Sequence, residues 1–90
     1  MRYISIGMPL DKYEGTETGM GQFFKAYRVK NNSGKVVSLG LLHFIFWEML
    51  LNGVDYDSGK REWISKGYSE HYFDELLAIL KNEGLVNELR

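Results

Sequence analysis

The segment from Leu39 to Leu51 constrains the fold of this chain more than any other. Apart from Gly40, His43 and Glu48, all of its residues are apolar, so a helix formed here is apolar on nearly every side. Such a helix has to be buried by the rest of the chain, and we predict that it lies at the centre of the core. The run is far short of the roughly 20 consecutive apolar residues that cross a bilayer, so we predict no membrane partner.

A chain of 90 residues is large enough for one hydrophobic core and too small for two. Hydrophobic residues make up 44% of it and include two Trp, six Tyr and five Phe, which can fill that core without a disulfide or a metal. We therefore predict a single domain over residues 1–90. The chain has no Cys, and Gly7 and Pro9 interrupt the start where a signal peptide would be apolar, so we predict a cytoplasmic protein.

We expect residues 1–38 to be mainly β structure. Tyr3 to Ile6 alternates aromatic or β-branched residues with Ser, which predicts a short strand. Residues 11–21 are rich in Gly and show neither a strand period nor a helix period, so we predict a long loop there. The turn sequence Asn31-Asn32-Ser33-Gly34 then separates Phe23 to Lys30 from Lys35 to Ser38, which predicts a hairpin.

Residues 39–90 are predicted to form a helical module. After the helix at Leu39 to Leu51 we expect a loop from Val54 to Lys60 and one or two helical turns from Lys60 to Lys66.

The two halves of the chain differ in charge. Residues 1–38 hold six Lys or Arg against three acidic residues, whereas residues 39–90 hold five against nine. An anionic partner should therefore meet the first half of the chain.

The last helix has the clearest sequence signals. Ser69 is a favoured N-cap residue, Tyr68 is placed to pack on Phe73, and Gly84 follows the predicted end. A buried stripe is predicted at helical spacing, at Phe73, Leu76, Leu77 and Leu80. Leu85 and Val86 then predict a short return strand, so the fold class is α+β: an N-terminal strand and a β-hairpin, three helices and a short C-terminal strand.

Catalytic and metal-binding patterns are weak. There is no Cys, and the two His have no Ser, Asp or Cys signature around them. We predict a core or boundary role for His43 and a solvated position for His71. The Asp55-x-Asp57 pair starts like a calcium loop, but Lys66 stands where such a loop needs Glu. The sequence therefore predicts no catalytic residues, no metal and no cofactor, and we expect a binding protein instead of an enzyme.

Basic and aromatic residues alternate around the predicted hairpin, in which no acidic residue occurs. These residue types grip phosphates and stack on bases, so Lys25, Arg28, Lys30 and Lys35 are candidate nucleic-acid contacts. The alternative is a solvated edge hairpin whose lysines discourage edge-to-edge pairing.

The spacing of three segments resembles the winged-helix superfamily: Leu41 to Gly53, Trp63 to Ser69 and Phe73 to Val86. The resemblance implies an apolar first helix, a short second helix and a capped third helix. In DNA-binding members the third helix enters the major groove. Here that helix carries an excess of acidic residues, with only Lys81 to balance them, and phosphate would repel it.

Gly34 to Leu39, running straight into the first helix, is similar to the third strand and first helix of peptide-recognition domains from ribosomal-peptide maturation, such as the chaperone of pyrroloquinoline quinone biosynthesis. That family has three strands followed by three helices, and a leader peptide adds to the sheet edge beside the third helix. The resemblance implies a peptide site formed by Lys35, Val36, Val37, Ser38, Tyr72 and Glu75.

We therefore expect a non-enzymatic module that binds a protein or peptide through the sheet edge and the last helix. A nucleic-acid-binding regulator that uses the basic hairpin is the first alternative. A small phage or plasmid accessory protein that inhibits a host protein is the second. An aromatic-rich chain of this size is also compatible with a homodimer that covers apolar surface.

Overall fold

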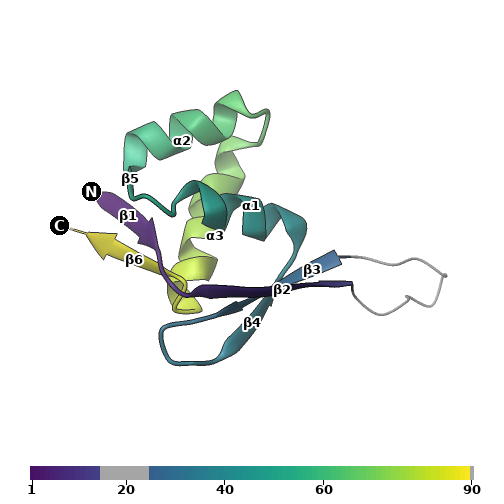
Figure 1. The fold of residues 1–90 in the computed structure, drawn as a ribbon. Helices are drawn as coiled ribbons and strands as arrows, with labels where there is room; N and C mark the ends of the chain where they lie inside the picture. Colours follow the sequence, from purple (N-terminus) through teal and green to yellow (C-terminus); the bar gives the residue numbers. More distant parts are fainter. Residues whose placement is uncertain (15–24, 90) are drawn as a thin grey trace.

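The computed structural model describes residues 1–14 and 25–89, which form three helices and two small antiparallel sheets (Figure 1). In chain order the elements are β1 (Arg2–Ser5), β2 (Met8–Glu14), β3 (Lys25–Lys30), β4 (Val36–Leu39), α1 (Leu41–Met49), β5 (Val54–Asp55), α2 (Tyr56–Ser65), α3 (Glu70–Asn82) and β6 (Val86–Leu89). The α+β class and the predicted order of a strand, a hairpin, three helices and a C-terminal strand are confirmed. Within the described residues no helix is both long enough and apolar enough to cross a membrane.

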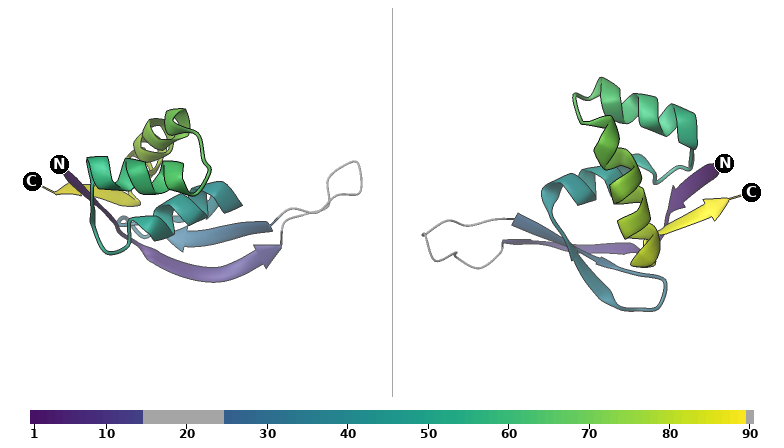
Figure 2. Two further views of the ribbon diagram at one scale, coloured as in Figure 1. Left: turned by 90° about the horizontal axis from the view of Figure 1, so that it is seen from above. Right: turned by 180° about the vertical axis from the view of Figure 1, so that it is seen from behind.

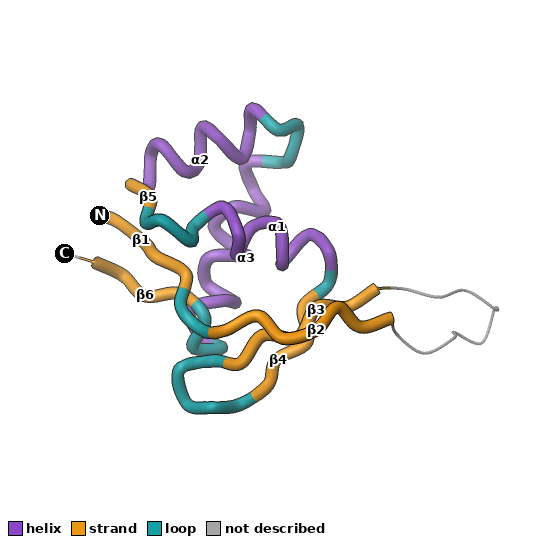
Figure 3. Tube along the Cα trace, in the orientation of Figure 1, coloured by secondary structure: helices purple, strands orange, loops and turns teal. Residues whose placement is uncertain are grey.

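One sheet has the strand order β5-β1-β6 and the other has the order β2-β3-β4 (Figure 3). In the first sheet β1 lies in the middle, with Tyr3 opposite Val54 on one side and opposite Glu88 on the other. The N-terminal strand therefore completes a sheet whose other two strands come from the second half of the chain. The β-rich and helical segments of the sequence are interleaved in space.

The chain passes from one sheet to the other at Gly7. Its φ of 106° is unfavourable for any other residue, and a Cβ there would lie 2.5 Å from the Lys30 carbonyl oxygen. The indole Nε1 of Trp47 holds this crossing in place by donating to the carbonyl oxygens of Ile6 and Leu85, each at 3.1 Å. One buried side chain on α1 thus fixes the junction between the two sheets.

The hydrophobic core is a single cluster with members from β1, β3, β4, β6 and all three helices. Its centre is aromatic: the ring of Phe46 lies edge-on to both Trp63 and Phe73, with each pair of centroids 5.2 Å apart. The prediction that the apolar helix is central is therefore right for Phe46. Its bounds were wrong, because α1 is shorter than Leu39 to Leu51 and residue 39 ends β4 instead.

All three helices lie on one side of the β2-β3-β4 sheet (Figure 2). Contact between the layers includes Tyr27 of β3 stacked on Phe44 of α1, with ring centroids 4.2 Å apart. The hairpin predicted at Asn31-Asn32-Ser33-Gly34 is confirmed. The Asn31 carbonyl accepts from Gly34 N–H at 3.0 Å, and Gly34 has a φ of 84°, as expected for a three-residue hairpin loop.

The loop predicted for residues 11–21 is wrong at its start, because Asp11–Glu14 belongs to β2. The remainder of that range, residues 15–21, lies outside the described residues, as do Phe23 and Phe24. Proline is tolerated in β2 because this strand is at the edge of its sheet, and the register shifts between Pro9 and Lys12. Pairing with β3, which the sequence of β2 does not reveal, makes this segment a strand.

The loop predicted from Val54 to Lys60 is also wrong. Two of its residues form β5, and α2 begins at Tyr56, where the side chain of Asp55 caps the helix by accepting from Asp57 N–H at 3.2 Å. The predicted short helix from Lys60 to Lys66 is therefore the C-terminal part of a longer one.

The predicted start of α3 is right, since Ser69 occupies the N-cap position, although its hydroxyl makes no capping hydrogen bond. Its carbonyl oxygen instead accepts from Trp63 Nε1 at 3.0 Å. Tyr68 stacks on the ring of Trp63, with centroids 4.1 Å apart. The return strand β6 starts at Val86 and runs further than the predicted pair of residues.

Candidate peptide-binding groove

The turn of the β3–β4 hairpin is fastened to the end of α3. The side-chain Nδ2 of Asn31 donates to the Glu83 carbonyl oxygen at 2.7 Å, and Asn32 N–H donates to the Gly84 carbonyl oxygen at 3.3 Å. Gly84 has a φ of 74°, and a Cβ at this position would collide with Asn32 Oδ1. These contacts fix β4 beside the last turns of α3.

A pocket of about 170 Å³ lies between β4, the start of α1 and the C-terminal half of α3. In the right-hand view of Figure 2, α3 is in front of α1 and ends next to the turn of the hairpin. The pocket is lined by Val37, Ser38, Leu39, Gly40, His43, Ile79 and Glu83. An apolar cavity of about 150 Å³ holds a benzene molecule, so this pocket has room for one large side chain.

β4 is an edge strand, and among the described residues it pairs only with β3. Asn31 N–H donates to the Lys35 carbonyl oxygen at 2.8 Å, and hydrogen-bonded pairs alternate along an antiparallel ladder. The backbone groups of Val37 and Leu39 therefore point to β3. Those of Val36 and Ser38 point outward, and this edge can pair with another strand.

The structure brings together some of the peptide-site residues predicted from the sequence. Val37 and Ser38 line the pocket, Val36 is exposed on the same edge, and Lys35 is exposed in the turn before β4. The prediction therefore falls on the free edge of the sheet. The sequence signal was the alternating pattern that follows a strong turn.

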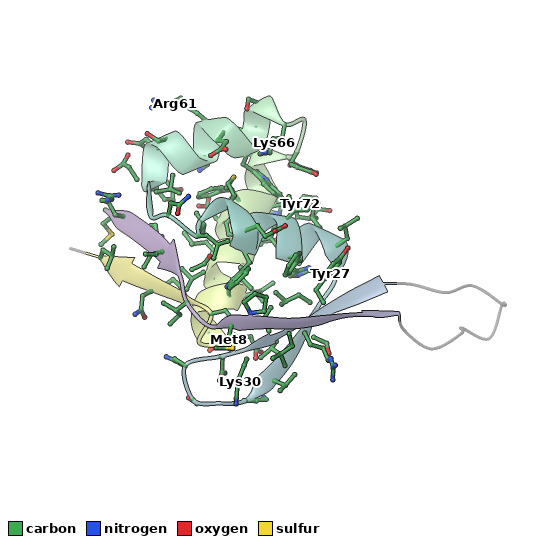
Figure 4. All side chains as sticks on the ribbon, viewed as in Figure 1. Met8, Tyr27, Lys30, Arg61, Lys66 and Tyr72 are labelled. Carbon is green, nitrogen blue, oxygen red and sulfur yellow. The ribbon has the colours of Figure 1, made fainter. Side chains whose placement is uncertain are left out.

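The two predicted α3 residues, Tyr72 and Glu75, do not line the pocket. Tyr72, which is labelled in Figure 4, is exposed, and Ile79 follows it by two turns of the helix, or about 10 Å along the axis. The Oε1 atom of Glu75 lies 3.0 Å from His71 Nε2. Ile79 and Glu83 form the α3 wall of the pocket instead. The sequence signal that could have identified this wall is Ile79, an apolar residue at helical spacing from Tyr72.

The basic residues of the hairpin lie apart from this pocket. Arg28 and Lys30 alternate along β3 with Tyr27 and Val29, which face the helices and the core, so the two cations lie on the opposite face of the sheet. Figure 4 shows Lys30 at the hairpin end of the sheet. The side chain of Lys25, the first residue of β3, is outside the described part of the structure.

A polar network that the sequence did not reveal connects α2 to α3. Tyr56 donates its hydroxyl to Asp74 Oδ1 at 2.6 Å, and Lys60 Nζ contacts both Tyr56 Oη at 2.9 Å and Asp74 Oδ2 at 3.2 Å. Lys60 Nζ also lies 3.7 Å from Glu70. The one local signal for this network in the sequence is the spacing of four residues between Tyr56 and Lys60, which places both on the same face of a helix.

This network favours the charged forms of Asp74 and Lys60. The hydrogen bond from Tyr56, followed by that from Lys60, lowers the pKa of Asp74. The contact with Tyr56, and then those with Asp74, raise the pKa of Lys60. General acid–base catalysis needs a pKa near the working pH, and neither shift brings one closer to it. The arrangement is suited to joining two helices.

The described residues contain no group of three or more His, Cys, Asp or Glu side chains that could hold a metal ion. His43 lies at the pocket on α1, and His71 is exposed on α3.

Comparisons with protein-family models, with curated proteins and with solved structures found no match.

Proposed function

We propose that this protein binds an extended peptide segment of a partner protein by adding it as a fourth strand to the edge of β4. The observation that carries the proposal is an edge strand with outward-pointing backbone groups directly beside a pocket walled by α3. Main-chain hydrogen bonds would supply affinity in this mode of recognition, and pockets for alternate side chains would supply specificity.

The order of elements supports the same function. The β2-β3-β4 sheet is followed by α1, α2 and α3, which is the order implied by the resemblance to peptide-recognition domains. In that family the leader peptide occupies the place that corresponds to the β4 edge.

The chain has no Cys, which favours a reducing compartment, and we propose the cytoplasm.

Nucleic acid fits this groove less well. The α3 wall of the pocket contributes Glu83 and no cation, and the described basic residues of β3 lie on the other face of the sheet. A phosphate group that entered the pocket would meet the Glu83 carboxylate, and no Lys or Arg is among the residues that line the pocket.

The proposal can be tested by selecting binders from a display library of random 12-residue peptides. The test variant is Ser38→Pro, which removes an outward-pointing N–H and leaves the ladder to β3 intact. Ser38→Ala is the matched control because it changes only the side chain. Val36→Pro blocks the other outward N–H and serves as a second test variant.

Peptides selected on the unmodified protein should bind Ser38→Ala with similar affinity and should lose most of their binding to Ser38→Pro and Val36→Pro. Circular dichroism and thermal unfolding establish that each variant is folded. If the selected peptides bind folded proline variants as well as they bind the unmodified protein, strand addition at β4 is wrong.

A further inference from the structure

The surroundings of Glu83 indicate which side chain the groove prefers. Glu83 is the half-buried C-cap residue of α3, and its carbonyl oxygen is held by Asn31 at 2.7 Å. Its backbone is therefore fixed where it lines the pocket. Within the described part of the chain, no Lys, Arg or His nitrogen lies within ion-pair distance of its carboxylate.

The basic residue in the last turn of α3 does not neutralise Glu83. Lys81 is directed to the opposite side of the helix, where its Nζ lies 3.8 Å from Glu88 and 5.5 Å from the centre of the Tyr3 ring. The C-terminal end of a helix carries a partial negative charge, which adds to that of the Glu83 carboxylate. This end of the pocket therefore favours a cation.

The remaining walls of the pocket favour an apolar stem. Val37 is half-buried, Leu39 is buried, and Ile79 is 44% exposed although it is aliphatic. A side chain that crosses these residues buries its methylene groups and ends near Glu83. Lysine and arginine combine an apolar stem with a charged head in this way.

We propose that the pocket selects a Lys or Arg at one position of the bound strand. Its stem packs on Val37 and Ile79, and its head pairs with the Glu83 carboxylate. In an added strand only alternate side chains turn toward α3, so the preference applies to one residue and its immediate neighbours point elsewhere. The inference rests on the proposed strand addition and adds the chemistry of the recognised residue.

The test compares selections from the same random 12-residue library on four proteins: the unmodified chain, Glu83→Gln, Glu83→Lys and Glu62→Lys. Glu62→Lys is the control, because it makes the same charge change at an exposed position of α2 outside the pocket. The unmodified protein and Glu62→Lys should enrich Lys or Arg at one position. Glu83→Gln should lose that enrichment, and Glu83→Lys should enrich Asp or Glu there.

Affinities of one synthetic peptide from the selection provide a second measurement. Replacing its selected Lys or Arg by Gln should weaken binding to the unmodified protein about tenfold, as expected for a partly desolvated charged pair. The same replacement should have no effect on binding to Glu83→Gln.

Different results would refute strand addition at β4 and the recognition of Lys or Arg by Glu83. Selected peptides that lose binding to Ser38→Pro support strand addition. If such peptides show no preference for Lys or Arg, or if selection on Glu83→Lys gives the same preference, the role of Glu83 is wrong and strand addition stands. If no peptide is enriched on the unmodified protein, or if enriched peptides bind the proline variants equally well, both inferences are wrong.

Discussion

Asn31→Ala should destabilise this protein more than its place in a surface turn would suggest. The side chain makes three hydrogen bonds: Nδ2 donates to the Glu83 carbonyl oxygen at 2.7 Å, and Oδ1 accepts from Ser33 N–H at 3.0 Å and from Lys35 N–H at 2.9 Å. The first bond fastens the hairpin to the end of α3. The other two close the turn itself.

The magnitude follows from the exposure of each bond. A hydrogen bond contributes about 0.5–1.5 kcal/mol to stability, and the two bonds inside the turn are exposed, so each should be near the lower limit. The bond to Glu83 is partly buried and should be near the upper limit. The sum is about 2 to 2.5 kcal/mol, a substantial part of the roughly 5–13 kcal/mol expected for 90 residues.

Urea unfolding followed by circular dichroism measures this loss. With a slope of about 1 kcal/mol per molar, the midpoint should fall by about 2 M. Asn32→Ala is the matched control, because the side chain of Asn32 accepts only a long contact of 3.4 Å from Ser33 Oγ. The docking of the hairpin on α3 would be refuted if Asn31→Ala and Asn32→Ala unfolded at the same urea concentration.

Three further predictions concern the core, the helix network and nucleic acid. Leu76→Ala should cost about 2–5 kcal/mol because this residue is 3% exposed, whereas Ile79→Ala should change the denaturation midpoint little. Because the pKa of Asp74 is lowered in the folded protein, its contribution to stability is present above about pH 4 and is lost as pH falls through the folded pKa. The difference in stability between the unmodified protein and Asp74→Asn should therefore shrink in acid. A difference that stays unchanged down to about pH 2 would contradict the network. Labelled single-stranded and duplex DNA should bind only weakly at physiological salt, and submicromolar binding abolished by Lys30→Glu together with Lys35→Glu would favour the nucleic-acid alternative.

Local sequence signals were sufficient for the hairpin and for α3. The Asn31-Asn32-Ser33-Gly34 turn holds its hydrogen bonds within a few residues, and Gly34 supplies the positive φ that the loop requires. Ser69 and Gly84 mark the two ends of α3, although the Ser69 hydroxyl makes no capping hydrogen bond. The buried face of the helix follows from apolar residues at helical spacing. These features depend on neighbours in the sequence and were predicted correctly.

β2 and the start of α2 could not be predicted in the same way. The β2 segment contains Pro9 and has no regular alternation, and it becomes a strand because β3 offers a partner for its backbone. In the sequence Asp55 stands only in a pair that starts like a calcium loop without completing one, whereas in the structure its carboxylate caps α2. In both places the residue pattern was compatible with several structures, and a contact elsewhere in the fold selected one.

The candidate groove shows the same division. The sequence by itself determined that Val37 and Ser38 lie in a strand after a tight turn, because turn chemistry and alternation are local properties. Only the tertiary structure decided that this strand is an edge and that Ile79 and Glu83, instead of Tyr72 and Glu75, form the opposite wall of the pocket. That choice depends on where the hairpin meets α3, and it is made by a hydrogen bond between Asn31 and Glu83, which are 52 residues apart. No local pattern encodes a contact over that separation, since it exists only once the sheet and the helix have packed on the same core.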